Sequence, residues 1–331
     1  MTTAADLTAQ LIAIDSVNPA LVPGGAGERE AAAFVARWAE AQGLEVAMLE
    51  ETPGRPSVLV TARGSGGGRT LLLCGHLDTV NVDGMDRPHE PRRDGDRLYG
   101  RGGYDMKAGV AAALVAVREA AQRDLRGDVV VACVADEEHS SLGIQEALRH
   151  VRADAAIVTE PTELEVIVAH RGFVWAEIEV AGVAAHGSRP HLGVDAIVKA
   201  APVLTGIGAL DARLIAETSH PLLGRGSVHA GTIAGGIEPS SYPGRCTITV
   251  ERRTLPGETE ATFAGEVLGR VPEIAGASYW ADAAFIAAAG IPTVMFGPVG
   301  EGAHALEEWV SVASTESVAR TLTAIAARIC V

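Results

Sequence analysis

The sequence predicts an α/β protein with a central mixed sheet, helices on both faces of that sheet, and a smaller inserted α+β domain. Three observations lead to this prediction. In the first half of the chain, extended segments alternate with segments of helical periodicity. Those extended segments are apolar throughout, as in a sheet covered on both faces. From about Gly172 the extended segments instead alternate between apolar and polar residues, which is typical of a sheet with one covered face.

The elements of the first half follow one another regularly. Helical periodicity is found over 27–43, 108–123 and 141–150. Extended apolar segments cover 69–78, 127–138 and 155–160. Strands separated by helices in this way predict a sheet whose neighbouring strands are joined by helical crossovers.

A glycine-rich segment, RGSGGG (63–68), separates the strand SVLVTAR (57–63) from the strand that begins at Arg69. We expect a hairpin turn there, which would pair the two strands. A phosphate-binding loop would have to lead from a strand into a helix, and that context is missing.

The second half predicts the inserted domain and the return to the first sheet. The strand at 173–182 is followed by a helix at 193–204, strands at 227–236 and 245–253, and a helix at 258–270. The segments 282–290, 291–297 and 313–329 then resume the order helix, buried strand and helix. We therefore assign 1–171 and 277–331 to one domain and 172–276 to a domain inserted into it.

Composition excludes several classes of protein. The chain has 331 residues and a formal net charge of -15, with no cluster of Lys and Arg, so we expect no nucleic-acid partner and no anionic membrane surface. The amino terminus lacks a basic and apolar leader, and no apolar run reaches the roughly 18 residues of a membrane span, so we expect a cytoplasmic protein. The four cysteines have no CxxC spacing and should be buried, reduced thiols.

Titratable side chains follow several of the predicted strands. They are His76, Asp78, Asp105, Glu137, Glu138, Glu160 and His304. Ligands of α/β sheets bind at the carboxyl ends of the strands, which makes these residues candidates for a site. Taken singly, each has an ordinary interpretation, such as a structural histidine or a solvated acidic helix start. Taken together, imidazoles and carboxylates at successive strand ends predict zinc or a similar divalent ion.

The residue types also suit a pair of metal ions. Two ions about 3.5–4 Å apart need a bridging carboxylate, and Asp105 would serve. A metal-activated water needs a proton acceptor that is not itself a ligand, so one of Glu137 and Glu138 can bind metal while the other acts as general base. Asp78 leaves the strand on the same face as His76, and its carboxylate would fix the orientation of that imidazole.

With these residues, the sequence resembles the co-catalytic zinc amidohydrolases and peptidases that include acetylornithine deacetylase, succinyl-diaminopimelate desuccinylase, aminoacylase and glutamate carboxypeptidase. The matching segments occur in family order along nearly the whole chain. They are GHLDTV, LYGRGGYDMKAG, DEEHSSLG, VTEPTEL, VAGVAAHGSRPHLGVDAI, GTIAGGIEPSSYP, ERRTLPGE and AGIPTVMFGPVGEGAHALEEWV. The resemblance implies a zinc-peptidase-like catalytic domain and a ferredoxin-like lid or dimerisation domain.

The resemblance also implies roles for single residues. His76, Asp105 and Glu160 would bind one metal ion, and Asp105, Glu138 and His304 the other. Glu137 would be the general base. In the inserted domain, His186 would hydrogen-bond the oxyanion, often across a dimer, and Arg253 would bind the substrate carboxylate. Arg252 should point to the other side of its strand.

The sequence departs from the family pattern between the motif at 251–258 and Trp280. Family members usually have several dozen more residues there, and the missing part would hold the last strand of the lid, leaving three strands. Either the protein lacks this segment or the sequence omits it, and the unchanged motifs on both sides favour an omission. An intact mass near 34.2 kDa would exclude an omission.

Three functions remain open from the sequence. The preferred one is a hydrolase of the amide bond of N-acyl amino acids or similar small N-acyl compounds, with two divalent ions, most readily zinc, although cobalt and manganese can share such ligands. The second is a dipeptidase or carboxypeptidase that uses the same site. The third is an inactive relative that acts as a binding protein, and the intact set of ligands with Glu137 speaks against it.

Overall fold

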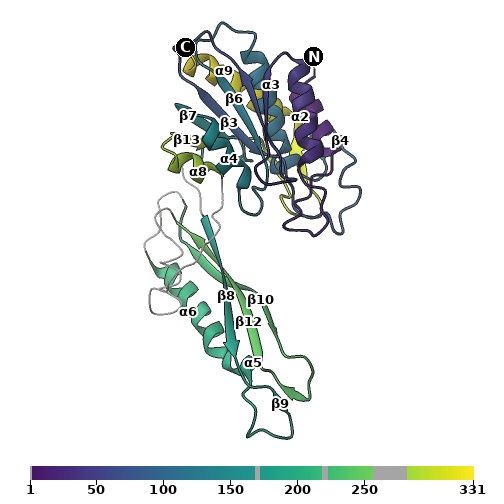
Figure 1. Ribbon diagram of the computed structural model, residues 1–331, viewed down its shortest axis with the longest axis vertical. Coiled ribbons are helices and arrows are strands. Elements are labelled where there is room, and N and C mark those ends of the chain that lie inside the picture. Colours follow the sequence, from purple (N-terminus) through teal and green to yellow (C-terminus); the bar gives the residue numbers. More distant parts are fainter. Residues whose placement is uncertain (1, 168–171, 218–222, 256–281) are drawn as a thin grey trace. The chain divides into compact units, whose positions relative to one another are not determined.

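The protein is described here by a computed structural model, which defines residues 2–167, 172–217, 223–255 and 282–331 (Figure 1). The chain forms two compact units. The first contains Met1–Val168 and Trp280–Val331, and the second contains Ala169–Tyr279. The second unit is therefore inserted into the sequence of the first.

A six-stranded sheet forms the centre of the first unit, with the strand order β1-β2-β6-β3-β7-β13. The strands are β1 (Glu45–Leu49), β2 (Ser57–Ala62), β3 (Leu71–His76), β6 (Val129–Val134), β7 (Ala155–Val158) and β13 (Thr293–Met295). β2 is antiparallel to β1 and β6, whereas β6, β3, β7 and β13 are parallel. The predicted fold class, an α/β protein with a mixed sheet, is confirmed.

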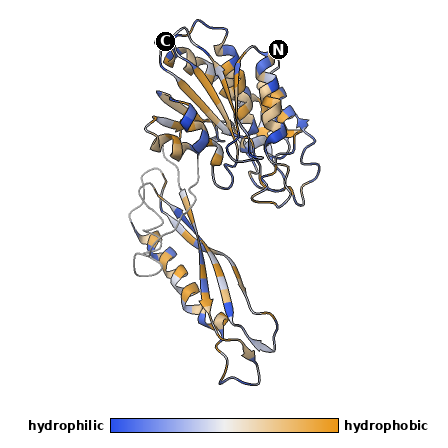
Figure 2. Cartoon of the chain, viewed as in Figure 1, coloured by the Kyte–Doolittle hydropathy of each residue, from blue (hydrophilic) through white to orange (hydrophobic). Residues whose placement is uncertain are grey.

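Helices cover both faces of this sheet. On one face lie α1 (Ala4–Ile12), α2 (Arg29–Ala41), α3 (Ala108–Ala120) and α9 (Val312–Ile329), and on the other α4 (Leu142–His150) and α8 (Asp282–Ala288). Leu71 and Leu73 of β3 pack in the first core, whereas Leu72 and Cys74 pack in the second. Because successive side chains of a strand point to opposite faces, a central strand is apolar on both sides, and the central strands are mainly hydrophobic in Figure 2.

The predicted hairpin at 63–68 is wrong. β6 lies between β2 and β3 and pairs with both, so the two strands that flank the glycine-rich segment are not neighbours. The segment instead hydrogen-bonds to the turn before β6, where Ser65 N donates to Leu125 O and Gly66 N donates to Arg126 O. β6 is buried along its whole length, and the central position satisfies its backbone groups on both edges.

A smaller four-stranded sheet lies in the same unit, in the order β14-β15-β5-β4. Its strands are β4 (Arg92–Asp94), β5 (Arg97–Tyr99), β14 (Gly300–Glu301) and β15 (Trp309–Ser311). The turn η1 (Gly103–Lys107) follows β5 and leads into α3. This sheet therefore joins the loop that carries His304, between β14 and β15, to the segment that leads to Asp105.

The second unit has a three-stranded antiparallel sheet in the order β10-β12-β8. Its elements are β8 (Gly172–Ala181), β9 (Ala185–His186), α5 (Ala196–Lys199), α6 (Ala201–Ala216), β10 (Ser227–Gly235), β11 (Ser241–Tyr242) and β12 (Arg245–Thr254). Side chains of α6 such as Ile207 and Leu210 pack with Ile248 and Val250 of β12. The helix predicted at 258–270 and the question of a last strand lie outside the described residues.

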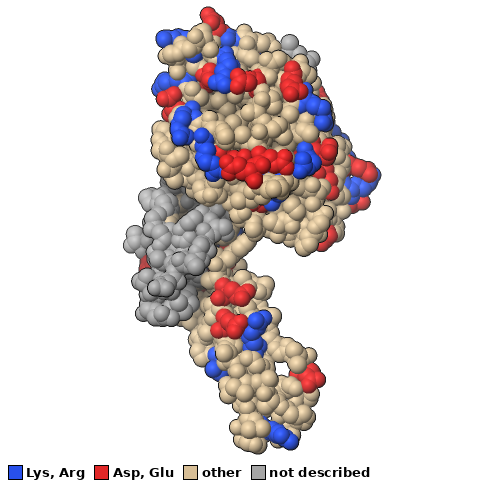
Figure 3. Space-filling view, in the orientation of Figure 1, with Lys and Arg blue, Asp and Glu red and all other residues tan. Residues whose placement is uncertain are grey.

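The composition led to expectations about membrane spans, cysteines and surface charge. No helix in the described part of the chain is long and apolar enough to cross a membrane. All four cysteines are buried and free, which confirms the expectation for the thiols. Acidic and basic side chains are interspersed over the face of the first unit in Figure 3. At the end of β2, for example, Arg63 pairs with both Glu45 and Asp128.

Candidate metal centre

The predicted ligands of the first unit come together at the carboxyl end of its central strands. His76 is the last residue of β3, and the segments after the parallel neighbours β6 and β7 carry Glu137, Glu138 and Glu160. Asp105 lies in η1, and His304 lies in the loop between β14 and β15. Five separate segments therefore place imidazoles and carboxylates at one edge of the sheet, as expected for a ligand site of an α/β protein.

Asp105 lies between the two histidines. Its Oδ1 is 3.2 Å from Nε2 of His76, and its Oδ2 is 3.3 Å from Nε2 of His304. Each carboxylate oxygen thus faces a different imidazole. This is the arrangement that a carboxylate bridging two metal ions requires.

The remaining carboxylates complete two groups of donor atoms. Glu160 Oε1 is 3.9 Å from Nε2 of His76, and both carboxylate oxygens of Glu138 lie 3.1 Å from Nε2 of His304. Donor atoms of a tetrahedral zinc ion lie about 3.4 Å apart when the metal–ligand bonds have their usual lengths. The two groups therefore fit two divalent ions that share Asp105.

Glu137 lies against the first of these groups. Its Oε2 is 3.7 Å from Nε2 of His76, and the side chain is 5% exposed. Glu137, His76 and Glu160 also have donor atoms within 4.8 Å of one another. A carboxylate in this position is close enough to exchange a proton with a water molecule held between the two groups.

The electrostatics of the cluster favour a cation. Burial raises the pKa of Glu138 to about 7 and that of Glu160 to about 8, and the nearby Asp105 carboxylate adds to both shifts. Burial likewise raises the pKa of Glu137 well above its usual range. Carboxylates that crowd together in a buried site resist ionisation unless positive charge compensates them. Divalent ions would supply that charge, so the residues fit a metal centre.

Asp105 and His304 lie at the centre of the cluster, and their pKa values are shifted in the directions that favour their charged forms. Burial alone would raise the pKa of Asp105, but its hydrogen bonds with His304 and His76 hold that pKa below its usual value. The same contact with Asp105, and a second one with Glu138, raise the pKa of His304 to about 10. Asp105 is therefore the carboxylate of the cluster that stays ionised most readily.

We expect added zinc to raise the melting temperature of the metal-free protein more at about pH 8 than at about pH 5.5. In the folded state Glu138 and Glu160 keep their protons up to pH values of about 7 and 8. In the unfolded chain both carboxyl groups lose their protons at about pH 4.3. Their contribution to stability is thus present below about pH 4.3 and is lost as the pH rises through their folded pKa values.

The ions bind the deprotonated carboxylates and so recover this loss at the higher pH. Thermal unfolding with and without zinc at the two pH values measures the difference. Equal increases at both pH values would contradict the placement of the ions among these carboxylates.

Asp78 acts on the site through the backbone more than through the ring of His76. The ring nitrogen Nδ1 of His76 lies 2.9 Å from the backbone carbonyl of Asp78, whereas the nearest carboxylate oxygen of Asp78 is 3.6 Å away. That carboxylate instead accepts hydrogen bonds from the backbone N–H groups of Glu137 and Glu138, at 3.1 and 3.2 Å. Asp78 therefore helps to hold both the imidazole of His76 and the backbone of Glu137 and Glu138. The two-residue spacing of His76 and Asp78 in the sequence does not reveal these contacts.

Glu308 is a buried residue of the site that the sequence reasoning missed. Its Oε1 accepts hydrogen bonds from the backbone N–H groups of Tyr104 and Asp105, each at 3.0 Å. Its Oε2 accepts from Gly102 N at 3.0 Å and from Arg101 Nη1 at 2.8 Å. Glu308 therefore holds the turn that presents Asp105. Its position four residues after His304, in a segment already singled out, is the only signal in the sequence.

The two predicted substrate residues lie in the second unit. His186 is exposed at the end of β9, and its Nδ1 lies 2.8 Å from Ser188 Oγ. The side chain of Arg253 on β12 is 41% exposed, with Nε donating to Glu251 Oε1 at 2.6 Å. Arg252 is 1% exposed, as expected for its opposite orientation on the strand. Of the two arginines, Arg253 is the one available to a ligand.

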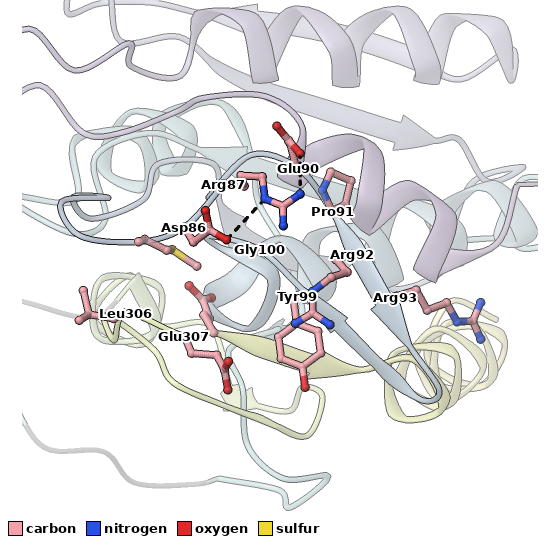
Figure 4. A pocket seen from close by; sticks show the side chains of 12 residues that line it. Asp86, Arg87, Glu90, Pro91, Arg92, Arg93, Tyr99, Gly100, Leu306 and Glu307 are labelled. Carbon is pink, nitrogen blue, oxygen red and sulfur yellow. Dashed lines mark hydrogen bonds and ion pairs between the residues drawn. The ribbon is translucent and has the colours of Figure 1, made fainter.

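A pocket of about 480 Å³ lies in the first unit beside the loop that follows His304 (Figure 4). Arg92 stacks on the ring of Tyr99, with the guanidinium carbon 3.9 Å from the ring centroid. Arg87 faces Glu90 and Asp86 within the same pocket, and Leu306 and Glu307 line it from the side of the His304 loop. The pocket therefore presents side chains of both charges near a predicted metal ligand.

Comparison with known proteins gives one family. Residues 72–328 match the model of peptidase family M20/M25/M40. Acetylornithine deacetylase from Vibrio cholerae is 33% identical over 254 residues, which cover 75% of this chain and 67% of that protein. An M20 family metallo-carboxypeptidase from Sulfolobus solfataricus has the same fold, with a TM-score of 0.74 at 17% identity over 98% of both chains. A dinuclear metal binding peptidase of the M20 family from Bacillus subtilis gives a TM-score of 0.66 at 14% identity, over 99% of this chain and 97% of that one.

Proposed function

The chain belongs to peptidase family M20/M25/M40 and is a metal-dependent hydrolase, and from this premise we propose that it cleaves the amide bond of N-acyl amino acids or similar small N-acyl compounds. The observation that carries the proposal is the position of Asp105 between the two histidines, with Glu137 against the same cluster. The identity of 33% with an acetylornithine deacetylase supports an N-acyl amino acid as substrate.

We propose two divalent ions, with zinc as the metal. His76, Asp105 and Glu160 would hold one, and Asp105, Glu138 and His304 the other. Neutral imidazole nitrogens mixed with carboxylate oxygens suit zinc, although cobalt and manganese accept the same donors. When bound, the ions polarise the substrate carbonyl and lower the pKa of a water molecule.

Glu137 would move the proton in this reaction. It is buried beside the group of His76 and Glu160, and its raised pKa favours acceptance of a proton from water. The same carboxyl group can then donate that proton to the leaving amine, whose basicity grows as the amide bond breaks. A single residue thereby serves both proton transfers, while Glu138 next to it in the chain binds metal.

Residues of the second unit would act on the substrate. We assign the oxyanion to His186 and the substrate carboxylate to Arg253. The hydrogen bond between Nδ1 of His186 and Ser188 leaves Nε2 of that ring available, and the exposed guanidinium of Arg253 suits a carboxylate.

We expect Arg253→Met to raise the KM for N-acyl amino acids by about 10-fold to 100-fold, since a hydrogen bond to a charged group is at stake. Arg253→Met and the unmodified protein should hydrolyse equally well an analogue whose carboxylate is replaced by an amide. Arg245→Met is a matched control, because Arg245 lies on the same strand and also pairs with a glutamate, Glu179. Steady-state kinetics of the three proteins test this, and an unchanged KM in Arg253→Met would refute the role.

The second unit would also mediate dimerisation. We propose that 172–276 is an inserted lid and dimerisation domain between catalytic segments 1–171 and 277–331, and that two chains associate through it. β10 supports this, because it is an edge strand of the described sheet and is exposed along most of its length. Light scattering of the purified protein measures the oligomeric state, and a monomer at micromolar concentration would refute a stable homodimer. A cytoplasmic location stays an expectation from the sequence.

Hydrolysis of a substrate panel by the metal-loaded protein tests the proposed activity. We expect turnover of N-acetyl amino acids, including N-acetylornithine, to exceed that of dipeptides of the same residues. The reverse order would favour a dipeptidase or carboxypeptidase using the same site. Metal binding without turnover of any amide would favour an inactive relative that binds its ligand.

A further inference from the structure

A buried network of side chains lies behind the segment that carries Glu137 and Glu138. We call it the anchor network, and its members are Asn18, Glu28, Arg55, Asp78 and Asp136. Four of them have no exposed surface, and the side chain of Arg55 is 10% exposed. Glu28, Asp136 and Asn18 thus meet around the guanidinium group of Arg55, and Asp78 joins them through Asn18.

Arg55 makes the central contacts of the anchor network. Its Nε donates to Glu28 Oε2 at 2.8 Å and its Nη2 to Glu28 Oε1 at 2.6 Å, which is a bidentate pair. Nη2 also lies 2.8 Å from Asp136 Oδ1 and 3.1 Å from Asn18 Oδ1. The fork of Arg55 therefore sets the positions of Glu28, Asp136 and Asn18 at once.

Asp136 is the first residue of the turn that carries Glu137 and Glu138. Its φ of 66° lies in the left-handed region, which aspartate and asparagine adopt more readily than other residues with a side chain. Its backbone carbonyl accepts from Ser140 N at 3.1 Å, and its N–H donates to Glu28 Oε1 at 3.2 Å. Hydrogen bonds within the turn therefore close it. Asp136 ties the turn to Arg55 in two ways, directly through its carboxylate and indirectly through its backbone N–H, which binds Glu28.

Asn18 joins this turn to Asp78. Its Nδ2 donates to Asp78 Oδ2 at 2.7 Å and to Asp136 Oδ1 at 3.1 Å. Asp78 in turn accepts from the backbone N–H groups of Glu137 and Glu138. The backbone of these two glutamates is therefore held on one side through Asp78 and on the other through Asp136.

From these contacts we propose that Arg55 is a positioning residue for hydrolysis, which sets the orientation of Glu137 and Glu138 through Asp136 and Asn18. The inference rests on the proposed function. Arg55 touches neither ligand group, so its effect on the reaction passes through the turn. Removing it leaves Glu28 and Asp136 as buried carboxylates without their cation, and they would move apart or draw in water. A shift of about 1 Å in a reacting group can cost about 10²-fold in rate.

Arg55→Met is the main test, and Arg63→Met, at an exposed arginine, is its control. Arg63 follows β2 as Arg55 precedes it, and it also pairs with two carboxylates, Glu45 and Asp128, far along the sheet from the ligands. We expect kcat of Arg55→Met to fall about 100-fold with KM changed less than about 3-fold. Arg63→Met should keep the kcat of the unmodified protein. Added guanidinium ion should restore part of the kcat of Arg55→Ala and none of that of Glu137→Gln.

Hydrogen exchange of the metal-free protein gives a readout that does not depend on activity. In Arg55→Met, the amides of 136–141 should exchange at least about 10-fold faster, while those of β3 and β6 keep their rates. A role in global stability alone would speed exchange throughout the first unit and leave kcat per folded molecule unchanged, and that result would overturn the proposal. If Arg55→Met does not fold, Glu28→Gln, which keeps the size of its side chain, should show the same local effect.

The two proposals fail in different ways. An unmodified protein without amidase activity would refute the proposed function, and the exchange of 136–141 would still report whether Arg55 holds the turn. Normal activity of the unmodified protein, with unchanged kcat and unchanged local exchange in Arg55→Met, would refute the role of Arg55 alone.

Discussion

Replacement of Glu137 by glutamine should lower kcat by about 10²-fold to 10⁴-fold while both metal ions stay bound, as expected for loss of a general base. The amide has the size of the carboxylate but cannot accept the proton. Glu137 lies beside the ligand groups, with Oε2 3.7 Å from His76 Nε2. Both metal ions should therefore keep their ligands in Glu137→Gln, because the assigned groups do not include this residue.

Metal analysis and steady-state kinetics of the same preparation measure this prediction. Glu301→Gln is the control, since Glu301 is an exposed carboxylate on β14 in the same unit. Its kcat should equal that of the unmodified protein. A Glu137→Gln protein that keeps most of its activity would refute the general base, and one that loses a metal ion would make Glu137 a ligand.

Replacement of Asp105 should remove both metal ions, whereas replacement of His304 should remove one. The two oxygens of Asp105 face different imidazoles, at 3.2 and 3.3 Å, so both ions depend on this carboxylate. His304 contacts only Asp105 and Glu138 within the cluster, and its loss leaves His76, Asp105 and Glu160 in place. We expect Asp105→Ala to have no measurable turnover and His304→Ala to keep one ion per chain.

Metal content after dialysis against a weak chelator distinguishes these outcomes. His139→Ala is the control, because its exposed imidazole follows Glu138 in the chain and belongs to neither ligand group. It should keep two ions. Retention of two ions by Asp105→Ala would show that this carboxylate does not bridge.

The sequence predicts well which segments form buried strands, because burial determines their apolar residues. It predicts poorly which strands pair with one another. A strand such as β3 is buried at every position and apolar up to its last residue, His76, because both of its faces are covered, and that property is visible in the sequence. The partner of β2 is not visible, because the glycine-rich segment after it is compatible with a hairpin, whereas β6 comes to lie between β2 and β3. Which strand fills the middle of a sheet depends on contacts between distant segments.

The site shows the same division between local and distant signals. The predicted ligands could be found because each is a titratable residue directly after an apolar strand or in a conspicuous loop. Arg55, Glu28 and Asn18 have no such signal, since in the sequence they resemble ordinary polar residues of loops and helix starts. Their importance comes from the contacts that bring them to Asp136, and only the fold reveals those contacts.

The most direct test of the two-metal account is a titration of the metal-free protein with zinc, following bound metal and hydrolysis of an N-acetyl amino acid in the same samples. The account predicts that two ions bind per chain and that full turnover is reached only when both are bound. Full activity with no bound metal, or saturation at a single ion with His304→Ala as active as the unmodified protein, would contradict it.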